Sequence, residues 1–149
     1  MLKSQEEYEM TLRRIEEDRQ VAARQRAELA ETGLSEEEIE QAMEPLLSFH
    51  AQLQEEAEWY RRIAAGDFTS LEELDAVGRL LIAVRIANNI TPAELAARLG
   101  VDEQQVMQDE RDEYYGFTKE ELQRVIDALG VRITTKVEPA SARELAIAD

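Results

Sequence analysis

The chain of 149 residues carries 33 acidic and 17 basic side chains, a formal net charge of −16, and no cysteine. The lack of cysteine excludes disulfides, thiol nucleophiles and cysteine-ligated zinc. No apolar run approaches the roughly 20 residues of a membrane span, and the first residues lack a signal-peptide core, so we expect a soluble cytoplasmic protein. Acids outnumber bases 16 to 8 over residues 1–66 and 13 to 7 over residues 71–133, so neither part is a basic nucleic-acid-binding module.

The first 66 residues are predicted to form a helical hairpin. Residues 4–31 contain no glycine or proline and are rich in helix-forming side chains, and Gly33 interrupts them. Ser35 with Glu38 three residues later is a capping box, which predicts a second helix over about residues 36–65. Because both helices carry an apolar stripe, packing them antiparallel is the simplest way to bury both.

The second helix has the most regular periodicity in the chain. Apolar residues recur there at alternating steps of four and three, interrupted only by one histidine, which is typical of a coiled-coil seam. Pro45 falls within it and is expected to kink the helix or delay its start. A narrow hairpin leaves apolar surface uncovered, so we expect a homodimer formed through this seam. The residues assigned to dimerisation are Ile39, Met43, Leu46, His50, Leu53 and Tyr60.

Residues 71–133 are predicted to form a second domain of four to five short helices. Capping signals mark the helix starts, and glycines mark two of the ends. The predicted starts are Ser70 with Glu73, Thr91 with Pro92, Asp102 with Gln105, and Thr118 with Glu121, and the glycines are Gly100 and Gly130. The chain is thus expected to be all-α, except for one short segment.

That segment is Val131 to Val137, which alternates apolar and polar residues as a strand does. One strand is not stable alone, so it either lies on the domain or pairs with its copy in a dimer. Residues 134–149 are therefore assigned to the end of this short strand and a flexible tail.

A helix-turn-helix pattern runs through the second domain. Arg85 lies in its first helix, Thr91 through Leu95-Ala96 form the next, Gly100-Val101 form the turn, and Val106 and Glu110 lie in the third. This segment of some 55 residues resembles the Cro/C1-type (Xre-family) helix-turn-helix domain. The resemblance implies a repressor-like transcriptional regulator that binds operator DNA as a dimer, with an ion pair between Arg85 and Glu110 tying two helices together.

The resemblance also implies which residues meet DNA. The third helix of the domain would lie in the major groove, where glutamine can bind adenine through two hydrogen bonds and glutamate can accept from cytosine. Pro92 occupies a position where DNA-binding members often have a phosphate-contacting glutamine. The assigned DNA-binding residues are Glu103, Gln104, Gln105, Gln108, Arg111 and Lys119.

The charge of this third helix favours a second interpretation. From Asp102 to Glu113 it holds six carboxylates and a single base, Arg111, whereas phosphate-gripping helices carry lysine and arginine. The alternative is a protein-binding module that holds a basic partner with its acidic surface, as an antitoxin does.

The sequence contains none of the common motifs of enzyme active sites. There is no glycine-rich phosphate loop, no nucleophile elbow and no histidine-base constellation. His50, the single histidine, lacks the glutamate three residues earlier that a di-iron bundle requires, because residue 47 is leucine. We therefore predict no catalytic residue, no metal and no cofactor.

Overall fold

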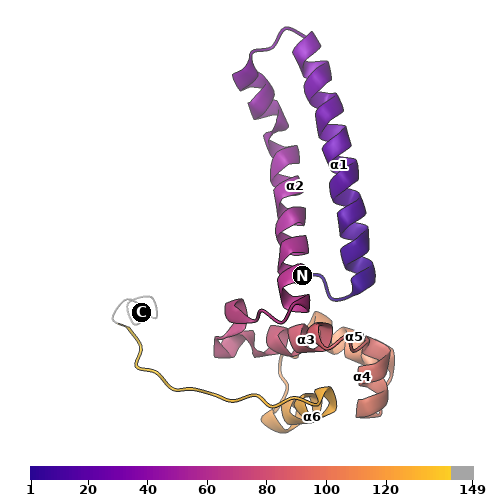
Figure 1. Ribbon diagram of the computed structural model, residues 1–149, viewed down its shortest axis with the longest axis vertical. Helices are drawn as coiled ribbons and strands as arrows, with labels where there is room; N and C mark the ends of the chain where they lie inside the picture. The colour runs from indigo at the N-terminus through magenta and orange to yellow at the C-terminus, as the bar shows by residue number, and fades with distance from the viewer. Residues whose placement is uncertain (142–149) are drawn as a thin grey trace.

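The computed structural model describes residues 1–141, and its regular structure is entirely helical. Two long helices, α1 (Gln5–Glu31) and α2 (Glu36–Ala64), run side by side in opposite directions and stand on a cluster of short helices (Figure 1). The cluster consists of α3 (Val77–Ala87), α4 (Pro92–Leu99), α5 (Glu103–Arg111) and α6 (Lys119–Leu129). Two single turns of 3-10 helix, η1 (Thr69–Leu71) and η2 (Leu74–Ala76), connect α2 to α3.

The turn between α1 and α2 is built from local signals. Gly33 adopts a φ of +79°, which side chains with a Cβ rarely adopt. Ser35 accepts a hydrogen bond from the N–H of Glu38, and the Glu38 carboxylate accepts one from the N–H of Ser35, which lowers the pKa of Glu38. α2 therefore starts at Glu36 and continues through Pro45.

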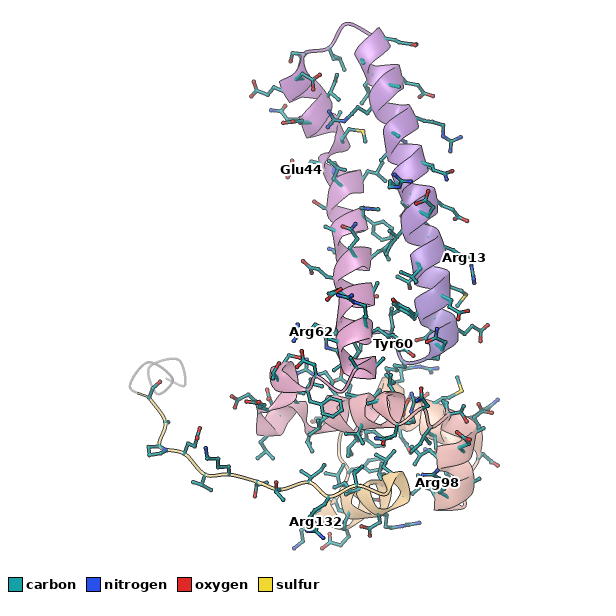
Figure 2. The ribbon with its side chains drawn as sticks, viewed as in Figure 1. Arg13, Glu44, Tyr60, Arg62, Arg98 and Arg132 are labelled. Atoms are coloured by element: carbon teal, nitrogen blue, oxygen red, sulfur yellow. The ribbon has the colours of Figure 1, made fainter. Side chains whose placement is uncertain are left out.

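The apolar stripe of α2 is buried by α1 of the same chain. Ile39, Met43 and Tyr60 are 3%, 2% and 5% exposed, and the ring of Tyr60 stacks on that of Tyr8 with centroids 4.8 Å apart. Figure 2 shows Tyr60 at the base of the pair, whereas Arg13 and Glu44 point outward.

The residues assigned to dimerisation are covered by α1 to different degrees. Of the six, Leu46, His50 and Leu53 are half-buried and the other three are buried. Dimerisation through this seam stays a prediction, and the three half-buried residues are the ones that keep surface for a second copy.

The start of α3 lies later than the sequence predicts. Ser70 does not cap a helix; the chain makes the two 3-10 turns first, and α3 begins at Val77. Leu74, which by its spacing to Leu81 would lie on the buried face of a helix that begins after Ser70, is 83% exposed. Within α3, Gly78 packs closely on the turn after α5: a Cβ on Gly78 would lie 1.8 Å from the backbone oxygen of Glu113.

The short helices share one core with the base of the long pair. Leu81, Ile82, Ala83 and Leu95 are fully buried. Leu2, just before α1, and Ile63, near the end of α2, both lie at the base of the long pair and belong to the same cluster of buried side chains. The long pair is therefore docked on the short helices through a continuous apolar interior.

Residues 131–141 leave α6 without regular secondary structure (Figure 1). The predicted strand from Val131 to Val137 is not formed, because a strand needs a partner and no other strand exists within residues 1–141. Most of the predicted flexible tail, residues 142–149, lies outside the described residues.

Candidate nucleic-acid interface

Helices α4 and α5 are joined by a tight turn that fixes their relative orientation. Thr91 and Glu94 form a reciprocal capping box at the start of α4, with Pro92 at its first position. Gly100 ends α4 in the left-handed conformation at φ +70°. Val101 then donates its N–H to the backbone oxygen of Ala96, which closes the last turn of α4. The two helices consequently pack directly against each other.

α5 has one buried face and one solvent face. Val106 and Glu110 are 1% and 2% exposed and point into the domain. The exposed face carries four of the residues assigned to base contacts: Glu103, Gln104, Gln105 and Gln108. Asp102 occupies the N-cap position, but its side chain caps no backbone N–H, so the capping box predicted with Gln105 is absent.

Arg85 and Glu110 form a buried ion pair between α3 and α5. The guanidinium Nη2 lies 2.8 Å from Glu110 Oε2, and Nε donates to the other carboxylate oxygen. Both side chains are almost fully buried, at 3% and 2% exposed. Because a buried carboxylate is stable only when it is paired and hydrogen-bonded, this geometry locks the orientation of α5.

The same ion pair binds the first residues of the chain. Arg85 Nη2 donates to the backbone oxygen of Lys3 at 2.7 Å, and Nη1 donates to that of Ile90 at 2.9 Å. Lys3 in turn donates from Nζ to the backbone oxygen of Glu110 at 2.7 Å. Sequence reasoning missed this role of Lys3, since nothing near it in the chain indicates a partner 107 residues away.

Tyr114 closes the other side of the ion pair. Its side chain is 5% exposed and makes an edge-to-face contact with Phe117, with ring centroids 5.2 Å apart. Burial raises the pKa of the Tyr114 phenol, and the nearby Glu110 carboxylate raises it further. Glu113 and Tyr114 both have positive φ, 53° and 57°, so the chain turns sharply after α5. Sequence reasoning also missed Tyr114.

The glutamines of the exposed face are already hydrogen-bonded to carboxylates. Gln105 donates to Asp109 at 2.7 Å, and Gln108 donates to Asp112 at 2.8 Å. Arg111 donates to the Gln108 amide oxygen at 2.9 Å. The amides of Gln105 and Gln108 are thus held along the helix in the free protein, by groups that would repel phosphate.

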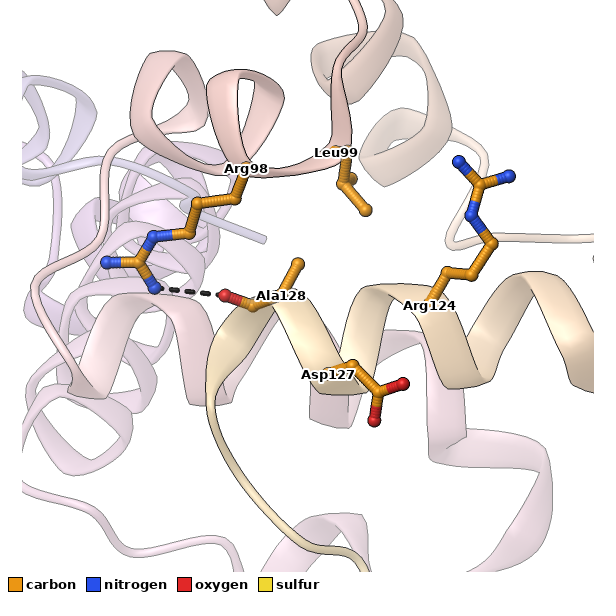
Figure 3. A pocket seen from close by; sticks show the side chains of 5 residues that line it. All are labelled: Arg98, Leu99, Arg124, Asp127 and Ala128. Atoms are coloured by element: carbon orange, nitrogen blue, oxygen red, sulfur yellow. Dashed lines mark hydrogen bonds between the residues drawn. The ribbon is translucent and has the colours of Figure 1, made fainter.

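The cations around α5 are few and mostly engaged. Lys119, 91% exposed at its side chain, lies 3.7 Å from Glu120, and Arg79 lies 3.8 Å from Glu113. Arg98 donates to the backbone oxygen of Ala128 at 3.0 Å. Figure 3 shows this contact beside a shallow, open hollow lined by Arg98, Leu99, Arg124, Asp127 and Ala128.

A second shallow hollow lies at the start of α5 and is lined by Asp102, Glu103, Gln104 and Gln105. It is open to solvent. Within residues 1–141 no group of three or more histidine, aspartate or glutamate side chains is arranged to hold a metal ion. In the same part of the chain no helix has the length and apolarity needed to cross a bilayer.

We compared the chain with protein families, curated proteins and solved structures. No family model, no curated protein and no solved structure matches this chain.

Proposed function

We propose that this protein is a DNA-binding transcriptional regulator of the Cro/C1 type, acting in the cytoplasm as a dimer. The observation that carries the proposal is the arrangement of α4, Gly100 and α5. It buries Val106 and Glu110 and leaves a row of glutamines on the outer face of α5. A helix held in this way on a small domain can enter the major groove.

Base reading would require an exchange of hydrogen bonds. Gln105 and Gln108 would release Asp109 and Asp112 and turn their amides toward adenine N6 and N7. Gln104, which makes no side-chain hydrogen bond with any described residue, can bind a base without that cost. Few cations face the backbone, so we expect few phosphate contacts and a shallow dependence of affinity on salt.

The first experiment is a fluorescence-anisotropy titration against the DNA upstream of the gene, at low and at physiological salt. We expect saturable binding that survives unlabelled random DNA and is lost in a Gln104→Ala/Gln105→Ala/Gln108→Ala variant. A matched control is Gln20→Ala on α1, because Gln20 donates to Glu16 at 3.1 Å in the same way but lies on the long pair. Absence of specific binding even at low salt contradicts the proposal for that DNA.

A second candidate function has its own supporting observation. The solvent face of α5 and the turn after it carry the carboxylates of Asp102, Glu103, Asp109, Asp112 and Glu113 with one arginine. An acidic surface of this kind is complementary to a small basic protein, and opposite charges accelerate such association. The chain would then resemble an antitoxin in its role.

One variant separates the two functions by the sign of its effect. Asp109→Asn/Asp112→Asn removes two charges that would lie near phosphates. If α5 binds DNA, affinity should rise about tenfold at low salt, since less repulsion opposes the phosphates. If α5 binds a basic protein, such as one encoded beside this gene, the same variant should weaken that complex. One titration measures the affinity of the variant for DNA and a second measures its affinity for the basic protein, each with the same protein preparation.

A further inference from the structure

The segment after α6 is an extended arm with no partner for its backbone. Residues 132–140 form no backbone hydrogen bond with any described residue. Val137 is 96% exposed. In Figure 1 the arm runs away from the short helices rather than over them. A row of free N–H and C=O groups on residues of high strand propensity is a template for pairing with another strand.

The arm already shows the two faces of a strand. Val131 and Ile133 pack against the core of the domain, whereas Arg132 and Thr134, which alternate with them along the chain, are exposed. Figure 2 labels Arg132 where the arm begins. Further along, Lys136 contacts Glu138, two residues on, as side chains on one face of an extended chain can. Odd-numbered residues therefore form a largely apolar face, and even-numbered residues form a polar one.

The arm is complementary to itself in one antiparallel register. When Thr135 lies opposite Thr135 of a second copy, Ile133 lies opposite Val137 and Arg132 lies opposite Glu138, each of these two pairs occurring twice. Apolar, opposite-charge and threonine pairs are the cross-strand combinations that stabilise a ladder. The remaining cross-strand pair, Thr134 with Lys136, neither stabilises nor destabilises this register.

Neighbouring registers are unfavourable. Centring the ladder on Thr134 places Arg132 opposite Lys136, and centring it on Lys136 places two lysines opposite each other. Sliding one strand along the other by a single residue places the polar side chains of one strand on the same face as the apolar side chains of the other. Pro139, which has no N–H to donate, ends the ladder.

We propose that residues 132–138 pair antiparallel with the same residues of a second copy, about a two-fold axis through Thr135. A two-fold interface closes on itself and gives a dimer rather than a filament. A two-stranded ribbon is marginal alone, but each strand here is anchored at its start, where Val131 and Ile133 already pack on the domain. The interface is independent of DNA binding: if it fails, the base-reading face of α5 remains as described.

Charge reversal in the full chain tests both the interface and its register. Sedimentation equilibrium over a range of concentrations gives the dimer dissociation constant. Glu138→Arg places like charges opposite each other twice, so we expect the dimer to weaken about tenfold. Arg132→Glu weakens it similarly, and the Arg132→Glu/Glu138→Arg double variant restores the dimer to near its original affinity. Thr135→Pro, which removes a central donor, should give a monomer.

Circular dichroism should show unchanged helix content in all four variants, because the arm lies outside the helices. Rescue by the double variant is a result that a merely disturbed domain cannot produce. A wild-type chain that is monomeric at every concentration overturns the proposal. So does a dimer that survives Thr135→Pro, or a double variant no tighter than the single ones. A DNA titration of Thr135→Pro then reports separately on α5.

Discussion

The long pair α1–α2 and the domain α3–α6 bury their side chains in different ways. The pair is two helices thick, so each helix has one partner face, and that interior includes Asp18 and His50. The domain surrounds its interior with four helices, and three consecutive residues, Leu81 to Ala83, are completely buried. Its one buried charged pair is fully hydrogen-bonded. The pair is therefore specified by a periodic pattern along the chain, and the domain by contacts between distant residues.

The largest expected effect comes from the ion pair of the domain. Glu110→Leu leaves the buried Arg85 without its carboxylate, so we expect a loss of about 4 kcal/mol in the free energy of unfolding. The contrasting site is Glu58 on α2, which pairs with Arg61 at 2.7 Å on an exposed surface. There Glu58→Ala should change the free energy of unfolding very little, because solvent screens an exposed ion pair. Urea unfolding followed by circular dichroism measures both.

The double variant Arg85→Met/Glu110→Leu is the control for this comparison. Removing both charges leaves no buried charge unpaired, although the backbone oxygens of Lys3 and Ile90 lose their donor, so part of the stability lost in the single variant should return. Equal losses for Glu110→Leu and Glu58→Ala would contradict the distinction between the two regions.

Glycines provide a second contrast. Gly78→Ala would place a Cβ 1.8 Å from the backbone oxygen of Glu113. That overlap should separate α3 from the turn after α5 and cost about 3 kcal/mol. Gly33, in the turn of the long pair, has open space around it and a φ of +79°. Gly33→Ala should therefore cost only about 1 kcal/mol, from backbone strain. Thermal unfolding of the two variants tests the order, and a larger cost at Gly33 would reverse it.

The sequence alone predicts the features that depend on residues close together in the chain, and it fails where distant residues come into contact. The capping boxes at Ser35 and Thr118 are formed as predicted, because each is a signal between residues three apart, and Thr91 caps α4 as predicted, with Glu94 completing a box that the prediction did not include. The glycines at Gly100 and Gly130 end their helices in the left-handed conformation for the same local reason.

The errors arise where distant contacts decide. Leu74 fits an apolar stripe by spacing, but the chain makes two 3-10 turns before α3 begins at Val77. Leu2 and Lys3 reach the core and α5 from the first residues of the chain. Neither contact has a counterpart nearby in the sequence. For the candidate site, the glutamines were assigned from the family resemblance and are exposed, whereas the pairing of Gln105 and Gln108 with Asp109 and Asp112 did not enter the prediction.

The polar residues inside the long pair offer the only expected gain in stability. Asp18, on α1, is 7% exposed, and His50, on α2, is half-buried. Each has one buried atom without a hydrogen bond: Oδ2 of Asp18 and Nδ1 of His50.

Unpaired buried polar atoms are costly, so Asp18→Leu/His50→Leu should raise the free energy of unfolding by about 2 kcal/mol. Each single variant should gain less, since it leaves the other unpaired atom buried. Thermal unfolding measures the three variants, and a loss of stability in the double variant would contradict the prediction.

The smallest effect concerns the junction between the two regions and depends on pH. Asp67 accepts hydrogen bonds from the hydroxyl and the N–H of Thr69, at 2.7 and 3.1 Å, and from Arg62 at 3.0 Å. These contacts lower the pKa of its carboxyl from 3.8 to about 2. A folded-state pKa below the unfolded value means that the contribution is complete above pH 3.8 and is lost as the pH falls toward 2.

Thr69→Ala removes the hydroxyl donor, which contributes most to the lowered pKa, and keeps the backbone N–H of residue 69, so the pKa of Asp67 should return part of the way to its ordinary value. A carboxyl-carbon NMR titration of both proteins measures this shift directly. Glu94 is the internal control, because its pKa is lowered by the Thr91 capping box within the domain and should not change in the variant. If Asp67 titrates at its ordinary pKa in the wild type, Thr69 and Arg62 do not hold its carboxylate in solution. The junction would then depend on apolar contacts such as those of Leu2 and Ile63 and on the hydrogen bonds of Arg85 and Lys3.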